Sequence, residues 1–265
     1  MRPPYVPSVG DPTVEQTISP SGVIRNGSTP TVLLVHGAFT DASMWAHVIA
    51  ELQAAGIGVT APANPLRGLE SDACYLACVA GEIDGPVLLT GHCYGGAVIT
   101  VAGTLASNVV GLIYVAAFTP DDGDSVLDIC RGFPAGQLVP YLRPAAYPGQ
   151  DGNRSVELYI DRDAFPRIFG ADMPHRAAAV AAAAQRPITA DAFAEKARSP
   201  AWKATQSWYM IATDDQLIPL AAQQFMARRA GAHTAEIRAS HAIALTQPAA
   251  VAEQIAAAAA SARAR

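Results

Sequence analysis

The sequence lacks the features of nucleic-acid-binding, membrane-spanning and secreted proteins. Only 15% of its 265 residues are charged, the formal net charge is −5, and no cluster or helix face of Lys and Arg occurs. A nucleic acid or an anionic membrane is therefore not expected as a partner. The longest apolar stretches, such as 109–118, are far shorter than the run of about 20 residues that a membrane-spanning helix requires. Residues 1–7 lead into no apolar segment, so we expect no signal peptide and a cytoplasmic location.

Cysteine is also scarce. The four cysteines, Cys74, Cys78, Cys93 and Cys130, have neither the spacing of a metal site nor the density of a disulfide-stabilised domain. Cys74 and Cys78 are expected to pack on one face of a helix, and no further metal-ligating residues accompany them. The sequence therefore predicts no metal site.

Segments typical of strands and helices alternate along most of the chain. The hydrophobic content of 51% is sufficient for the core of one large α/β domain. We expect strands at 14–19, 22–25, 31–35, 57–60, 86–90, 109–117, 207–212 and 234–238, and helices at 42–55, 71–83, 97–106, 221–230 and after Pro248. This alternation predicts a mostly parallel central sheet with helices on both faces.

The alternation is interrupted between residues 118 and 205. Prolines, among them Pro134, Pro140, Pro144, Pro148 and Pro166, divide this region into short amphipathic pieces, with helical segments expected at 177–184 and 191–198. A segment of this length between two core strands is most simply an inserted lid. We therefore predict a single domain, with a core of about 1–118 and 206–265 and a helical lid insertion of about 119–205.

One short segment carries a nucleophile between a strand and a helix. Cys93 lies in Gly91-His92-Cys93-Tyr94-Gly95-Gly96, after the apolar run 86–90 and before a helix-like stretch. Small residues on both sides of the nucleophile are what a sharp strand-to-helix turn requires. A helix N-terminus also favours the negatively charged thiolate. This pattern predicts a reactive Cys93, whereas a cysteine in another context is more often a small buried apolar residue.

Four motifs in sequence order resemble those of the α/β-hydrolase superfamily, in its branch of small, lid-bearing esterases and lyases. They are 34–39 (Leu-Val-His-Gly-Ala-Phe), the turn at Cys93, 213–219 (Thr-Asp-Asp-Gln-Leu-Ile-Pro) and 240–242 (Ser-His-Ala). Each motif is weak alone, but the order nucleophile, acid, histidine, with each at the end of an expected strand, is specific. The resemblance covers almost the whole chain and implies the α/β-hydrolase fold.

The resemblance also assigns the catalytic residues. His241 would exchange a proton with Cys93 and the leaving group, and Asp215 would orient the imidazole. Some members of this fold place the acid in the loop after the strand at 109–117, so Asp121, Asp122 and Asp124 are the alternative acids; otherwise these residues cap a helix.

Two backbone N–H groups are expected to bind the oxyanion, those of Ala38 and Tyr94. Phe39 is a candidate pocket wall and a less favoured donor. His36 and His92 flank the same turns and are expected to hold loops by hydrogen bonds, with His92 also a pocket candidate.

Cys93 departs from the family pattern, because most members carry serine at this position. The acyl-enzyme would then be a thioester, which carbon and nitrogen nucleophiles attack readily. We expect a hydrolase of carboxylic esters, lactones or thioesters that acts on a small-molecule acyl substrate without a metal or organic cofactor. An acyltransferase or Dieckmann-type cyclase with the same acyl-enzyme is the alternative. Less favoured are a cofactor-free lyase, a serine esterase altered to cysteine and a non-catalytic binding protein. No motif defines the substrate or the oligomeric state.

Overall fold

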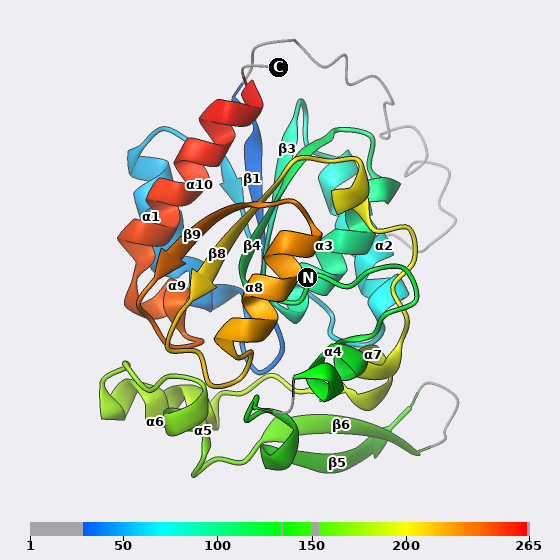
Figure 1. The fold of residues 1–265 in the computed structure, drawn as a ribbon, viewed down its shortest axis with the longest axis vertical. Helices are drawn as coiled ribbons and strands as arrows, with labels where there is room; N and C mark the ends of the chain where they lie inside the picture. The colour runs from blue at the N-terminus through cyan, green and yellow to red at the C-terminus, as the bar shows by residue number, and fades with distance from the viewer. Residues whose placement is uncertain (1–28, 134, 150–153, 264–265) are drawn as a thin grey trace, which may run out of the picture.

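A central parallel sheet organises the molecule (Figure 1). The computed structural model describes residues 29–133, 135–149 and 154–263, so the strands expected at 14–19 and 22–25 lie outside the described residues. Within this part of the chain, six strands pair in parallel in the order β2-β1-β3-β4-β8-β9. Their bounds are β1 (Thr31–Val35), β2 (Val59–Thr60), β3 (Val87–Cys93), β4 (Val109–Ala117), β8 (Ser207–Ala212) and β9 (His233–Ile237). These strands confirm the expected parallel sheet.

Alternate residues of the strands pack against helices on opposite faces. Val32 and Leu34 belong to one buried cluster and Leu33 and Val35 to the other, because successive side chains of a strand point to opposite sides. Figure 1 shows α1 (Ala46–Ala54) and α10 (Pro248–Arg263) on one face and α2 (Leu69–Gly81), α3 (Tyr94–Leu105) and α8 (Leu220–Arg229) on the other. The short η2 (Ala42–Trp45) and α9 (Ile243–Thr246) join the first group. Both faces of the sheet are therefore covered, as predicted.

The region 118–206 is not wholly helical, and the prediction of a helical lid is wrong in this respect. Strands β5 (Leu142–Pro148), β6 (Arg154–Ile160) and β7 (Ile188–Thr189) form a separate antiparallel sheet. The helical pieces are α4 (Val126–Gly132), η3 (Val139–Tyr141), α5 (Phe165–Ile168), α6 (His175–Ala183), α7 (Ala190–Ala194) and η4 (Ala201–Lys203). Pro144 and Pro148 fit in β5 because it is an edge strand, where a missing N–H is tolerated.

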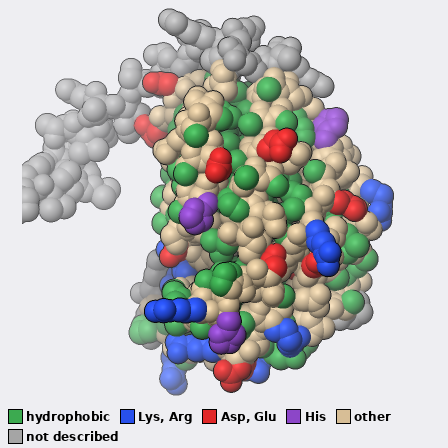
Figure 2. Space-filling view, turned by 90° about the vertical axis from the view of Figure 1, so that its left-hand side faces the viewer, with side chains coloured by type: hydrophobic (Ala, Val, Ile, Leu, Met, Phe, Trp, Pro, Cys, Tyr) green, Lys and Arg blue, Asp and Glu red, His purple; other side chains and the backbone are tan. Residues whose placement is uncertain are grey.

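The region 118–206, for which we keep the name lid, lies mostly at one end of the molecule. Figure 1 places β5, β6, α5 and α6 together there. On the face in Figure 2, Lys and Arg side chains lie mainly towards this end, interspersed with apolar and acidic side chains. No helix in the described ranges has the length and apolar character needed to cross a membrane.

Candidate active site

Cys93 lies at a strained turn between β3 and α3. It is the last residue of β3, its φ and ψ are 52° and −122°, and its side chain is buried. A Cβ atom at Gly91 would lie 2.5 Å from the carbonyl oxygen of Gly95, and one at Gly95 would lie 2.4 Å from that of Val35. The turn is therefore closed so tightly that glycine is required on both sides of Cys93, as the sequence predicted.

His241 and Asp215 form a buried pair. His241 lies between β9 and α9, Asp215 follows β8, and the Nδ1 atom of His241 is 2.8 Å from Oδ2 of Asp215. Both side chains are fully shielded from solvent. Because the carboxylate can only accept, Nδ1 carries the hydrogen, which leaves Nε2 as the nitrogen available for proton transfer. Within the described residues, Nε2 has no hydrogen-bond partner.

The electrostatic surroundings of His241 favour its protonated form. Burial lowers the pKa of His241, but the negative charges of Asp215 and Cys93 and the hydrogen bond to Asp215 outweigh burial and raise the pKa to about 10. His241 also lies beside the end of β3, because its carbonyl oxygen is 2.9 Å from Nε2 of His92, the residue that precedes Cys93. The arrangement is suited to a thiolate stabilised by an imidazolium.

The alternative acids lie elsewhere. Each of them has a partner that is not His241: Asp121 pairs with Lys203, Asp122 accepts the N–H of Ser199, and Asp124 pairs with Arg229. Asp215 is the residue of this group that the structure brings to His241.

The loop after β1 packs directly on Cys93. A Cβ atom at Gly37 would lie 2.5 Å from the Cβ of Cys93, so the backbone of this loop closely approaches Cys93. Tyr94 is the first residue of α3, and its N–H therefore has no acceptor within the helix. The N–H of Phe39 donates to the carbonyl of Arg186 at 2.9 Å. Ala38 and Tyr94 remain the candidate oxyanion donors, and Phe39 does not.

The hydroxyl of Tyr94 is held by a residue that the sequence analysis missed. It donates to Oδ2 of Asp72 at 2.9 Å, and both side chains are buried. Asp72 also accepts the N–H of Arg67, and burial raises its pKa. The sequence contained one sign of this role, because Asp72 is a carboxylate on the apolar face of α2, between Leu69 and Leu76.

Two further histidines hold backbone around the site. The Nε2 atom of His92 is 2.9 Å from the carbonyl oxygen of His241, and the two rings lie 4.6 Å apart. His36 accepts the N–H of Asn64 at 3.0 Å through Nε2. Burial lowers the pKa of His36 to about 4 and that of His92 well below its usual value. Both imidazoles are therefore neutral and position loops, and the His92 ring lies against that of His241.

Gln223 is a second buried residue that the sequence analysis missed. Its amide nitrogen donates to Oδ2 of Asp215 at 3.0 Å and to the carbonyl of Ile218 at 2.8 Å, and its amide oxygen accepts the N–H of Ala212. It fixes the acid to α8. The available signal was a polar residue that shares the buried face of α8 with Met226.

The lid holds the loop that carries His241. Asp172 accepts the N–H of Ser240 at 3.1 Å and the hydroxyl of Thr246 at 2.9 Å. The carbonyl of Phe169 accepts the N–H of Ala242 at 3.0 Å, and the Phe169 ring packs edge-on against the ring of His241 at 5.0 Å. The lid therefore contributes directly to the position of the imidazole.

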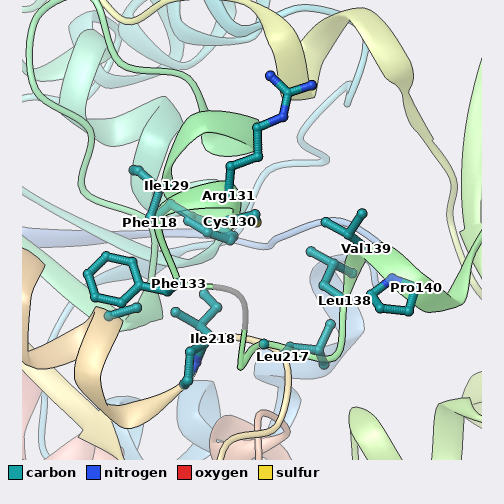
Figure 3. A pocket seen from close by; sticks show the side chains of 13 residues that line it. Phe118, Ile129, Cys130, Arg131, Phe133, Leu138, Val139, Pro140, Leu217 and Ile218 are labelled. Atoms are coloured by element: carbon teal, nitrogen blue, oxygen red, sulfur yellow. The ribbon is translucent and has the colours of Figure 1, made fainter.

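Two apolar cavities lie near these residues. The first, called here the α4 cavity, has a volume of about 340 Å³ and is formed by α4, η3 and the turn after Asp215 (Figure 3). The second, called the α6 cavity, has a volume of about 580 Å³ and is formed by α6, η2 and the loop that contains Phe39. Phe39 lines the α6 cavity. Among the described residues, no group of three His, Cys, Asp or Glu side chains is arranged to hold a metal ion.

Comparison with known proteins shows which family has this architecture. The profile of the alpha/beta hydrolase family matches residues 32–254. The chain belongs to this family. A carbendazim-hydrolysing esterase of Nocardioides sp. (strain SG-4G) is 33% identical over a match of 36% of this chain and 45% of the esterase. The chain thus aligns with less than half of the length of that relative.

Two solved structures illustrate the shared fold. Polyneuridine aldehyde esterase is 21% identical, with a TM-score of 0.75 over 87% of this chain and 99% of its own. A pyrethroid hydrolase from Sphingobium faniae JZ-2 is 23% identical, with a TM-score of 0.73 over 88% and 98%. At these identities the similarity establishes the fold.

Proposed function

We propose that this alpha/beta hydrolase cleaves a carboxylic ester, lactone or thioester, with Cys93 as nucleophile, His241 as general base and acid, and Asp215 as the orienting carboxylate. The observation that carries the proposal is the buried His241–Asp215 pair, which lies against His92 next to a cysteine at a strained strand-to-helix turn. Backbone strain of this kind in a non-glycine residue is concentrated at functional sites.

The reaction follows from this arrangement. His241 accepts the proton of the Cys93 thiol, and the sulfur attacks the carbonyl carbon to form a C–S bond. The carbonyl electron pair moves to oxygen, where the N–H groups of Ala38 and Tyr94 stabilise the negative charge. The tetrahedral intermediate collapses, the bond to the leaving group breaks, and His241 protonates that group. Water then attacks the thioester, with His241 accepting its proton, and Cys93 is released.

The names of similar proteins support ester hydrolysis as the reaction type. The relative from Nocardioides is an esterase, and polyneuridine aldehyde esterase and the pyrethroid hydrolase share the fold. Their substrates are not transferred to this chain, because a shared fold hosts many chemistries.

Acyl transfer is the second candidate, and one observation favours it. Cys93 and His241 are both fully buried, so the site restricts the access of water to a thioester intermediate. An acyltransferase would use the same steps up to the acyl-enzyme and then pass the acyl group to an amine, alcohol or carbanion.

Intact-protein mass spectrometry with p-nitrophenyl acetate tests the proposal. Cys74 and Cys78 are exposed, so both are replaced by serine to remove background acylation. We expect an acetyl adduct on Cys93 that is absent in Cys93→Ala, whereas a persistent adduct in Cys93→Ala would contradict the assignment. Free acid formed at the rate of p-nitrophenol release indicates hydrolysis. A burst of about one equivalent followed by slow release indicates transfer.

A further inference from the structure

The α4 cavity adjoins the triad at two points. Phe118 lines the cavity, and its N–H donates to the carbonyl of Cys93 at 3.0 Å. Leu217 and Ile218 line it as well, and their N–H groups hold Oδ1 of Asp215 at 2.8 and 3.0 Å. Residues in the cavity wall are therefore hydrogen-bonded directly to Cys93 and to Asp215.

Cys130 also lines the cavity, from α4. Burial, and then the charge of Cys93, raise the pKa of Cys130 to about 12. At neutral pH the Cys130 thiol is uncharged, so it acts as an apolar wall and not as a second nucleophile.

The cavity lining is almost entirely apolar. Its large side chains are those of Phe118, Ile129, Phe133, Leu138, Leu217 and Ile218. The charged residue at the cavity is Arg131, whose side chain is 70% exposed, and Figure 3 shows its guanidinium extending away from the apolar side chains. A carboxylate within this cavity would lose its hydration without gaining a partner.

We propose, building on the function proposed above, that the α4 cavity binds the acyl group of the substrate and that this group is uncharged and apolar. The volume of about 340 Å³ holds roughly ten heavy atoms at about 30 Å³ each, the share of a water molecule in the liquid. The substrate class is thus an ester or thioester of a medium-chain or monocyclic carboxylic acid. The leaving group lies outside the α4 cavity.

The test uses p-nitrophenyl esters from acetate to dodecanoate, which vary the acyl group and keep the leaving group constant. For the unaltered protein, kcat/KM rises with chain length by up to about fourfold per buried methylene group and then levels off. Mono-p-nitrophenyl glutarate, which ends in a carboxylate, is at least about 100-fold poorer than the valerate ester.

Two substitutions change the cavity in opposite directions. Cys130→Phe fills it and lowers kcat/KM for hexanoate at least about tenfold relative to acetate. Leu138→Ala enlarges it and moves the optimum to longer chains. Ala177→Phe, in the exposed wall of the α6 cavity, is the matched control and leaves the acyl-chain profile unchanged. Circular dichroism and thermal unfolding establish that each variant is folded.

The outcomes separate this inference from the proposed function. If no ester acylates Cys93, the proposed function fails. If Cys93 is acylated but Cys130→Phe and Leu138→Ala leave the chain-length profile unchanged, or Ala177→Phe changes it instead, the acyl group lies elsewhere and the inference is wrong. Equal rates for the glutarate and valerate esters would also overturn it.

Discussion

Replacement of Asp215 by asparagine tests the arrangement of the proposed triad. Four donors converge on this carboxylate: His241 and Gln223 on Oδ2, and the N–H groups of Leu217 and Ile218 on Oδ1. Asparagine has the same shape but can accept hydrogen bonds on only one side. In either orientation its NH₂ group faces two of the four donors. The site is therefore specific for a carboxylate.

The expected loss of stability follows from the burial of the Asp215–His241 pair. The Asp215 and His241 side chains have no solvent exposure, and removal of one partner of such a pair costs about 3–5 kcal/mol. We expect the free energy of unfolding of Asp215→Asn to fall by about that amount. The rate should fall as well, because the asparagine amide favours hydrogen on Nε2 of His241, the tautomer that cannot accept a proton from Cys93. The corresponding change costs about 10⁴-fold in a serine protease. A thiolate depends less on the acid, so we expect a loss of about 10²-fold or more.

Single-turnover release of p-nitrophenol from an activated ester measures the acylation step, and chemical denaturation measures stability. Asp121→Asn and Asp124→Asn are the matched controls, because these carboxylates pair with Lys203 and Arg229 near the surface, and both should retain at least about half of the acylation rate. A rate for Asp215→Asn within threefold of the unaltered protein, or a larger loss in either control, would refute the assignment of the acid.

Three further predictions concern residues around the site. Gln223→Met removes the donor to Oδ2 of Asp215 and should lower the acylation rate about tenfold. The control Gln224→Met loses only an exposed hydrogen bond to Glu236 and should leave the rate unchanged. Equal effects of the two substitutions would exclude a positioning role for Gln223. Gly95→Ala places a Cβ 2.4 Å from the Val35 carbonyl oxygen and should reduce the free energy of unfolding by at least about 1–3 kcal/mol, whereas Gly81→Ala, with open space around its Cβ, should not reduce it. Burial lowers the pKa of His36 from 6.5 to about 4, so the unfolded chain binds an extra proton between these pH values, and stability should fall by up to about 3 kcal/mol as the pH drops from 6.5 to 4. In His36→Gln this pH dependence should be weaker, and in a variant of the exposed His175 it should be unchanged.

The core of the fold was predictable because its signals are local. The aliphatic run of β1 and the glycines around Cys93 specify a buried strand and a sharp turn without information from distant residues. Helix α3 begins at Tyr94, three residues before the expected start at 97. The glycines at positions 95 and 96 mask its helical pattern, although they are required there by the close approach of the neighbouring backbone.

The lid sheet and the supporting polar residues were not predicted, for physical reasons. The sequence of β6 alternates Val156, Leu158 and Ile160 with polar residues, but its partner β5 contains prolines, which obscure a strand pattern. Asp72 and Gln223 act through contacts with residues 22 and 8 positions away in the chain. Their role depends on tertiary packing, and a polar residue on an apolar helix face was the only local sign of it.

The lid also binds the core on both sides of the proposed reaction centre. Arg186 accepts the N–H of Phe39, next to the candidate oxyanion donor Ala38, while Phe169 and Asp172 hold the loop of His241. Separation of this region of the lid from the core therefore breaks hydrogen bonds on the oxyanion side and on the imidazole side together. The proposed catalytic geometry therefore depends on these contacts as a set, because any displacement of this region from the core would disturb both sides of the reaction centre at once.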